Sequence, residues 1–326
     1  MRLTRLGIVL TALIVIFAGA KTAPAADYPD RAVKVVVPFA AGGFMDVVGR
    51  IASERLSQSL GQPVVVENRG GAGGRIGEDF VTNSQPDGYT LIIDLVIRPT
   101  LTQMQPVSAG DQDIEIEKAF VPIGPIGSSP MILNVSPSFG VKDFASFVKK
   151  IRSEPGKHSY ASAGVGTPSQ VVSAQLVREL GLNAVHVAYR GGAPALQDVT
   201  AGVVAWMVDT PSGSLPLIQG GRVVPLFVVN PTRVKELPDV PTLSELGHPG
   251  FRDEIMSIYL MAPAATPKPV IDRLSTALMQ LQADATVRSR FENISIEAAP
   301  PTDLQATRKL VRDQIDAWDK AVKQAK

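Results

Sequence analysis

Two glycine-rich segments contain the residue types that bind anions. The first, residues 38–46, reads PFAAGGFMD and lies between a strand-like run, Val33–Val37, and a helical pattern with Asp46 as its N-cap. A helix that starts there leaves backbone N–H donors and the positive end of its dipole free to meet a carboxylate or phosphate. The residues expected to contact such a group are Ala41, Gly42, Gly43, Phe44 and Asp46. Taken alone, the loop is better explained as a tight turn in which glycine serves only the backbone, but a second such segment changes this balance.

The second segment, residues 160–169, reads YASAGVGTPS and again joins a strand-like run to a helical pattern. Its hydroxyl groups can donate to carboxylate oxygens, and its small residues let the backbone approach a ligand. The candidate residues are Ser162, Ala163, Gly164, Gly166, Thr167 and Ser169. Two opposed helix N-termini would clamp a carboxylate, and ligands of open α/β sheets bind at the carboxyl ends of strands. For each residue separately, a role in capping or turn formation stays open, as for Ser169 as an N-cap.

Three further residues follow strand-like runs and are candidates for the same cleft. Tyr189 and Arg190 stand beside a Gly-Gly pair, where they either reach the cleft or form a surface arginine and a half-buried tyrosine. Asp209 either caps the next helix or faces the cleft and pairs with an ammonium or hydroxyl group of a ligand.

An enzyme is the alternative from another functional class. Ser162, Asp209 and His248 occur in the chain order of an α/β serine hydrolase. A nucleophile elbow, however, requires glycine two positions before the serine, and this chain has Tyr160 there. A binding protein without catalytic activity is therefore the preferred interpretation, and the hydrolase is the runner-up.

Other chemistries lack their motifs. In the glycine-rich run at residues 68–77, Ile76 stands where a dinucleotide-binding fingerprint needs its third glycine, and no nucleotide-binding P-loop occurs. The three histidines are widely separated and the chain has 0 Cys, so neither a metal nor a thiolate site is indicated. We expect no cofactor and no metal.

Strand and helix patterns alternate along the chain. This alternation predicts an α/β fold with a mainly parallel sheet and helices on both faces, and it repeats after residue 129. We therefore expect two doubly wound α/β lobes, with residues 27–128 and 230–326 in lobe 1 and residues 129–229 in lobe 2. Residues 95–119 are expected to form a loop with a short helix. The helical tail from Pro269 is expected to pack back on lobe 1.

Length and composition agree with a two-lobed, exported protein. A chain of 326 residues with 45% hydrophobic residues exceeds what one core usually fills. Arg2 and Arg5 precede an uncharged run at residues 7–20 and small residues, the order of parts in a signal peptide, so residues 1–26 should be cleaved and the mature chain should begin near Asp27. The mature chain would carry 29 basic and 31 acidic residues, a balance that recruits neither nucleic acid nor anionic lipid.

Ordered motifs over nearly the whole mature chain resemble those of one receptor family. They lie at residues 28–29, 36–43 with Asp46, 61–69, 71–74, 86–91, 160–162, 164–167, 194–196, 237–242 and 262–263. In these segments the sequence resembles the substrate-binding receptors of tripartite tricarboxylate transporters, also called Bug-type receptors. The resemblance implies a type II periplasmic binding-protein fold with a ligand cleft between the lobes. It also implies a monomeric periplasmic receptor that delivers a small organic mono- or dicarboxylate to membrane components of a tripartite transporter.

This chain departs from the family pattern at two places. Many members carry a small hydroxyl residue where this chain has Phe44, and a loop with Ser, His or Asn where it has residues 95–100. The pocket is therefore expected to be more apolar, with Phe44 and Met45 contacting an apolar or aromatic ligand body, or to use Arg98 as a charged clamp for a second carboxylate.

Overall fold

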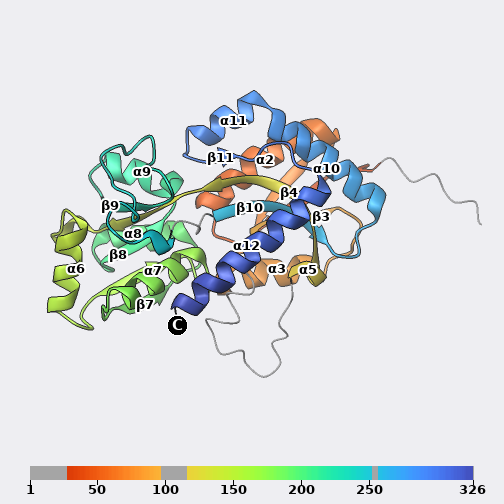
Figure 1. Cartoon of the computed structure of the whole chain (residues 1–326). Helices are drawn as coiled ribbons and strands as arrows, with labels where there is room; N and C mark the ends of the chain where they lie inside the picture. Colours follow the sequence, from red (N-terminus) through yellow and green to blue (C-terminus); the bar gives the residue numbers. More distant parts are fainter. Residues whose placement is uncertain (1–27, 97–115, 252–255, 326) are drawn as a thin grey trace, which may run out of the picture.

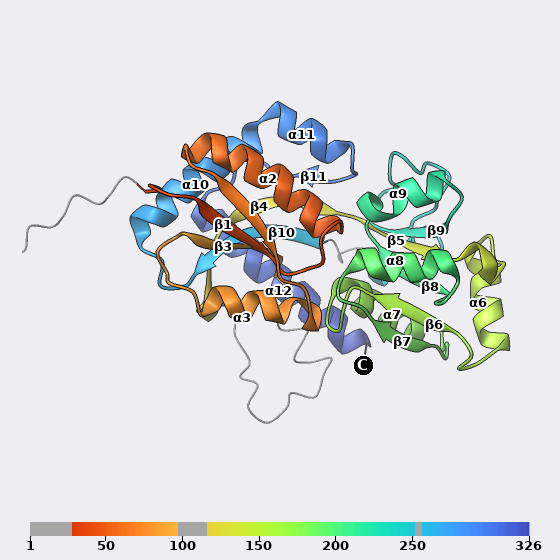
Figure 2. The same ribbon diagram turned by 180° about the vertical axis from the view of Figure 1, so that it is seen from behind.

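A computed structural model describes residues 28–96, 116–251 and 256–325, and Figures 1 and 2 show it from opposite sides. The predicted signal peptide and Arg98 lie outside the described residues. Most of the segment predicted as a loop with a short helix also lies outside them, but its end forms the short helix α5 (Ile116–Ala119). In the described part of the chain, no helix combines the length and the hydropathy needed to cross a membrane.

The first sheet has six strands in the order β11-β4-β10-β3-β1-β2. Its strands are β1 (Val33–Val37), β2 (Val64–Asn68), β3 (Thr90–Leu95), β4 (Phe120–Ser129), β10 (Met256–Pro263) and β11 (Glu297–Ala298). β1 pairs in parallel with β2 and β3, as predicted. β10, however, runs antiparallel between β3 and β4, and β11 is antiparallel to β4. The prediction of a mainly parallel sheet is therefore wrong for this part of the molecule.

The long pair β4 and β10 was not recognisable from the sequence pattern. β4 reads FVPIGPIGSS, and prolines and glycines normally argue against a central strand. The pairing accommodates them through two register shifts, between Ile258 and Tyr259 and between Leu260 and Met261. Irregularities of this kind allow residues without a normal ladder bond to remain in a sheet.

Helices cover both faces of this sheet, because its strands are apolar on both sides. Val35 packs in the large core cluster with residues of α2 (Phe44–Leu60), whereas its neighbour Val36 packs on the other face with Val311 of α12 (Leu304–Ala325). The remaining helices of this lobe are η1 (Ala72–Gly74), α3 (Arg75–Thr82), α10 (Lys268–Ala283) and α11 (Ala285–Glu292). Figures 1 and 2 show α2, α10 and α11 on one face and α3 and α12 on the other.

The second sheet has five strands in the order β7-β6-β8-β5-β9. The strands are β5 (Met131–Val135), β6 (Ser159–Ser162), β7 (Val185–Ala188), β8 (Trp206–Asp209) and β9 (Val224–Val229). The accompanying helices are η2 (Pro137–Phe139), α6 (Phe144–Ser153), α7 (Pro168–Glu179), α8 (Gly192–Ala201) and α9 (Pro211–Gln219). β6, β7 and β8 are parallel, and β5 is antiparallel to β8 and β9. The molecule is thus a two-lobed α/β protein.

The chain connects the two sheets at three places. It passes directly from β4 to β5, it returns after β9 through a segment with η3 (Pro249–Phe251), and α12 spans both lobes. α12 packs on β4 of the first lobe and on α7 of the second, where Gln175 donates to Gln324 at 2.9 Å. The prediction that the tail packs on lobe 1 is therefore incomplete, because its last turns contact lobe 2.

Candidate functional site

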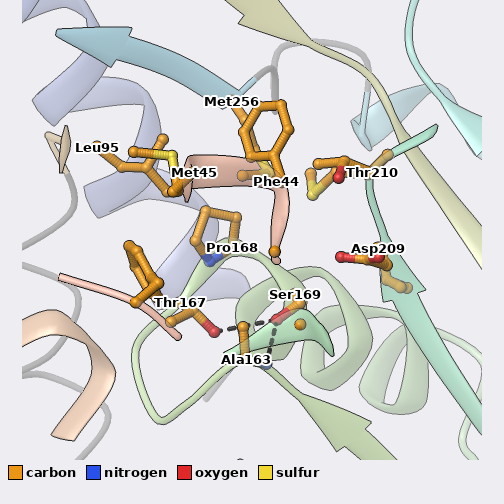
Figure 3. A pocket seen from close by; sticks show the side chains of 15 residues that line it. Phe44, Met45, Leu95, Ala163, Thr167, Pro168, Ser169, Asp209, Thr210 and Met256 are labelled. Carbon is orange, nitrogen blue, oxygen red and sulfur yellow. Dashed lines mark hydrogen bonds between the residues drawn. The ribbon is translucent and has the colours of Figure 1, made fainter. Parts of the chain in front are cut away.

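A cavity lies between the two lobes and is lined by residues from both (Figure 3). It encloses about 470 Å³ of space not filled by atoms, part of it open to solvent. The first lobe contributes Phe39, Gly43, Phe44, Met45, Leu95 and Met256, and the second contributes Met131, Ala163, Thr167, Pro168, Ser169, Gly192, Val208, Asp209 and Thr210. A mostly apolar lining with a few polar groups is typical of sites for small molecules.

Four helices begin at this cavity. Phe44 and Met45 form the first turn of α2, Ser169 that of α7, and Gly192 that of α8, while Thr210 is the N-cap of α9. Each helix follows a strand whose carboxyl end points at the cavity, so the parallel part of each sheet brings helix N-termini together. Each N-terminus carries roughly half a positive charge. The backbone therefore creates a site for an anion in an otherwise apolar lining.

The α2 loop is organised differently from the prediction. The N-cap is Gly43, not Asp46, because the helix starts three residues earlier than predicted, at Phe44. Asp46 does not line the cavity. Its Oδ2 accepts a hydrogen bond from the Gly42 amide at 2.9 Å, and its Oδ1 lies 2.9 Å from the Arg50 guanidinium. Burial alone would raise the pKa of Asp46, but the hydrogen bonds from Arg50 and Gly42 outweigh it, and the pKa lies below its ordinary value. Asp46 therefore holds the loop in place.

This arrangement leaves backbone donors for a ligand. Within the described residues, the amides of Phe44 and Met45 have no hydrogen-bond acceptor, because the first helical bonds of α2 come from Asp46 and Val47 to Gly43. In α7 the Ser169 amide is likewise without an acceptor among the described residues, and the first bonds come from Gln170 and Val171 to Thr167. Three amides from two lobes are therefore available at the cavity.

The segment between β6 and the first turn of α7, residues 163–169, is called the α7 loop. Among its hydroxyl groups, one proton is available for a ligand. Thr167 donates its proton to the Gly164 carbonyl at 2.6 Å. Ser169 Oγ accepts from the Ala163 amide at 2.9 Å and lies 3.0 Å from Thr167 Oγ1 (Figure 3). Because the Thr167 proton is committed, Ser169 must be the donor of that pair. Its proton is the one that can turn from Thr167 to a ligand.

Asp209 supplies the only ionisable side chain among the described residues that line the cavity. It ends β8, and its Oδ1 and Oδ2 lie 3.0 and 2.6 Å from where a Cβ would stand at Gly192 and Gly213. The two glycines therefore make room for the carboxylate. Burial raises the pKa of Asp209 to about 7, although the hydrogen bond from the Thr210 amide lowers it. Figure 3 shows the carboxylate directed toward the cavity.

Some of the predicted site residues lie beside the cavity and not in its wall. Gly42 lines an adjoining groove, and Ala41 is exposed. Tyr189 donates its hydroxyl proton to Asp198 at 2.6 Å, and the side chain of Arg190 is exposed. Ser162, Gly164 and Gly166 support the α7 loop from behind: Ser162 and Gly164 hydrogen-bond each other, and the Gly166 amide donates to Gln170. Gly43, Phe44, Ala163, Thr167, Ser169 and Asp209 do line the cavity.

The proposed hydrolase triad is not assembled. Ser162 is fully buried, and its Oγ lies 2.6 Å from Nε2 of His186. His248 instead pairs with Glu179 and lines a surface groove with Phe144. The alternative that combined Ser162 with Asp209 and His248 is therefore wrong.

The loops of the two lobes touch beside the cavity. A Cβ at Gly164 would stand 2.9 Å from the Cα of Gly73, and one at Gly191 would stand 3.1 Å from the nitrogen of Ala40. Both contacts join the two lobes, and both glycines have φ values, +141° and +146°, that side chains rarely adopt. The structure is therefore a closed form in which glycine permits backbone contact between the lobes.

Comparisons with known proteins agree with this architecture. A family model described as the tripartite tricarboxylate transporter family receptor matches residues 48–326. The UPF0065 protein of the tcbD-tcbE intergenic region in Pseudomonas sp. (strain P51) is 34% identical over 300 residues, which cover 90% of this chain and 86% of that protein. The solved structure of periplasmic binding protein BugD has a TM-score of 0.84 at 34% identity and covers 91% and 98% of the two chains. MatC from Rhodopseudomonas palustris with bound malate has a TM-score of 0.84 at 31% identity and covers 90% and 100%.

Proposed function

Because the chain belongs to the tripartite tricarboxylate transporter receptor family, we propose that it captures a small organic carboxylate between its two lobes and delivers it to a tripartite tricarboxylate-type transporter in the membrane. The observation that carries this proposal is the convergence of four helix N-termini on one cavity, with three unbonded amides from α2 and α7. The malate bound to MatC, a structure of the same fold, supports a carboxylate as the ligand class.

The ligand is a mono- or dicarboxylate with an apolar body, aromatic bodies included. One carboxylate meets the amides of Phe44, Met45 and Ser169, where hydrogen bonds to a charged group contribute about 1.5–3 kcal/mol each. Phe44, Met45, Leu95, Met131 and Met256 supply an apolar wall. Arg98 remains a proposal for the second carboxylate of a diacid.

The charge of the site limits what it accepts. Four helix N-termini contribute roughly two positive charges, and an ionised Asp209 cancels about one of them. The site therefore balances one ligand carboxylate when Asp209 is ionised, and a second when Asp209 is protonated. A diacid should accordingly bind together with a proton.

The proposed receptor is exported, with residues 1–26 as a cleavable signal peptide, and acts in the periplasm as a monomer. Lobe 1 comprises residues 27–128 and 230–326 and lobe 2 residues 129–229, a division supported by the separation of the strands into two sheets. Catalysis is not part of this function, because capture needs only fixed donors and closure. We propose no cofactor, no metal and no nucleic acid as partner.

Thermal unfolding of the mature chain tests the function. The protein is unfolded and refolded to remove bound ligand, and then mixed with aliphatic, hydroxy, amino and aromatic carboxylates. A ligand at 100 times its dissociation constant stabilises the folded state by about 2.7 kcal/mol. A raised midpoint with one class of acid, and none with the methyl esters of the same acids, is the expected result. Equal midpoints across the panel would contradict the proposal.

A further inference from the structure

A polar cluster behind the α7 loop takes no part in lining the cavity. Nε2 of His186, on β7, lies 2.6 Å from Oγ of Ser162, at the end of β6. Nδ1 of the same ring lies 3.3 Å from Nε2 of Gln170, in the first turn of α7. Oε1 of Gln170 accepts the Gly166 amide proton at 2.6 Å. The ring of His186 therefore joins the edge of the sheet to the loop that carries Thr167 and Ser169.

Counting protons fixes the direction of each hydrogen bond. The Gly166 amide can only donate, so the oxygen of the Gln170 amide faces it and the NH2 group faces the ring. Nδ1 of His186 is then the acceptor, and Nε2 carries the proton and donates it to Ser162. Ser162 in turn donates to the Gly164 carbonyl at 3.0 Å and accepts from the Gly164 amide at 3.2 Å. Every polar atom is satisfied, and the imidazole is neutral.

A second proton on the ring cannot be accommodated by this cluster. It would place an N–H of Nδ1 against the NH2 group of Gln170, and turning that amide would place its NH2 group against the Gly166 amide. Among the described residues, the His186 ring hydrogen-bonds with Ser162 and Gln170. The ring of Tyr160 stacks on it, with centroids 5.1 Å apart. Tyr160 is neutral, since burial raises its pKa to about 12, and no carboxylate is among these groups. Desolvation lowers the pKa of His186 to about 4, in agreement with this geometry.

We propose that His186 is a positioning residue whose neutral ring holds the α7 loop in its ligand-binding form, and that protonation of the ring in acid releases the loop and the captured carboxylate. The effect passes from His186 through Ser162 to Gly164, whose carbonyl also accepts the Thr167 proton at 2.6 Å. Thr167 is the partner of the Ser169 hydroxyl. This inference rests on the proposed function for its consequence in capture, but its structural part can be tested without any ligand.

Nitrogen NMR of the histidine rings tests the proton assignment directly. The chain has 3 His, so protein labelled with ¹⁵N-histidine gives few signals, and those absent in His186→Gln belong to His186. We expect protonated Nε2 and unprotonated Nδ1 at pH 7, and a ring that stays neutral well below pH 6. Protonated Nδ1 at pH 7, or a charged ring at pH 6, would overturn the proposal.

Amide hydrogen exchange tests whether the ring holds the loop. In the ligand-free protein, His186→Phe removes both ring nitrogens and should lower the protection of the amides at residues 163–167 about tenfold or more. Protection in the central strand β8 should not change, which separates a local effect from general destabilisation. His248→Gln, at a histidine that pairs with Glu179 on the surface, is the control and should behave as wild type. Unchanged loop protection in His186→Phe would refute the positioning role, and if this variant does not fold, the ring signals of the wild type still decide.

Titration calorimetry with L-malate between pH 7 and pH 4 tests the link to capture. The ratio of the affinities of wild type and His186→Gln removes the titration of the ligand and of Asp209, which both proteins share. We expect the ratio to be constant from pH 7 to pH 6 and the wild type to lose about twofold relative to the variant by pH 4, where a ring with a pKa of about 4 is half protonated. A constant ratio over the whole range would overturn the acid release. If neither malate nor any acid of the panel binds, the proposed function fails, whereas the ring and exchange measurements still decide on His186.

Discussion

At the scale of single residues, Ser169 is the side chain most directly committed to the ligand, because its hydroxyl proton is free to leave Thr167. Ser169→Ala should raise the dissociation constant for a bound acid about tenfold, the loss expected for one hydrogen bond to a charged group. Titration calorimetry measures this change. Ser173→Ala is the matched control, since Ser173 is buried in the same helix and donates to the Ser169 carbonyl. Equal affinities of wild type and Ser169→Ala would remove Ser169 from the site.

Asp209 should make capture of a diacid depend on pH. Its pKa of about 7, raised by burial, rises further when an anion binds beside it. Binding therefore takes up a proton, and affinity for malate should fall by up to tenfold per pH unit above about 7. Asp209→Asn should remove this dependence and bind more tightly than wild type at pH 8. Calorimetry at pH 6 and pH 8 checks this, and equal slopes in the two proteins would contradict it.

The same carboxylate affects folding stability. Because the pKa of Asp209 in the folded state lies above its ordinary value of 3.8, its protonated form stabilises the fold below that value, and this contribution is lost as the pH rises through about 7. Asp209→Asn should therefore unfold at a higher temperature than wild type at pH 8 and show a smaller advantage at pH 5. A wild type that is the more stable of the two at pH 8 would show that Asp209 has a favourable partner in the folded state.

The sequence predicted the hydrogen-bond donors of the site better than the apolar side chains that line it. Residues 38–46 and 160–169 stand out because strand, glycine loop and helix follow one another within ten residues. The role of Asp46 was misassigned. It was predicted as the N-cap, but its carboxylate accepts the Gly42 amide proton of the preceding loop from the third position of the helix. The partnership of Ser162 with His186 depends on the parallel register of β6 and β7, which pairs Tyr160 with His186. No spacing within the sequence reports that register.

At the scale of elements, the helix that departs most from the prediction is α12. It contacts both lobes, and Trp318 is 2% exposed in the core, whereas Leu310 on the same helix is 42% exposed. Trp318→Ala should lower the free energy of unfolding by about 3–5 kcal/mol because it leaves a large cavity. Leu310→Ala is the control and should change it by less than about 0.5 kcal/mol. Similar small losses in both variants would show that the end of α12 is not part of the core.

Elements with a regular period were predicted almost to the residue, and elements that cross between lobes were not. β1 is the predicted Val33–Val37, and α7 begins one residue before the predicted start at Ser169. β4 and β10 were missed because prolines and glycines in β4 mask its apolar alternation, and because their pairing joins segments more than 100 residues apart. Met256 belongs to β10, and β4 leads directly to Met131, so this part of the apolar wall was missed, whereas Phe44 and Met45 were predicted.

At the scale of the whole molecule, closure brings Ala40 of the first lobe against Gly191 of the second. Ala40→Val adds two methyl groups at this contact, and overpacking of that kind typically costs about 1–3 kcal/mol. The cost falls on the closed form, so affinity should drop about tenfold while the unfolding midpoint of the ligand-free protein stays the same. Calorimetry and thermal unfolding measure the two quantities. Ala265→Val, in an exposed turn, is the control.

The outcome for Ala40→Val depends on which form the ligand-free protein adopts. An unchanged affinity would show that the lobes do not need to meet at Gly191 for capture. A lower midpoint without ligand, together with lower affinity, would show that the contact also forms in the ligand-free protein. Small-angle scattering of wild type with and without an acid distinguishes these cases, since closure reduces the radius of gyration.

The most direct measurement is a crystal structure of the mature protein, stripped of ligand and reloaded with the acid that raises its unfolding midpoint most. The predicted result is a carboxylate in the cavity between the lobes, with its oxygens about 2.7–3.2 Å from the amide nitrogens of Phe44, Met45 and Ser169, directly or through one water. A ligand bound elsewhere, or one whose carboxylate points away from these helix N-termini toward Leu95 and Met256, would contradict the proposed mode of capture.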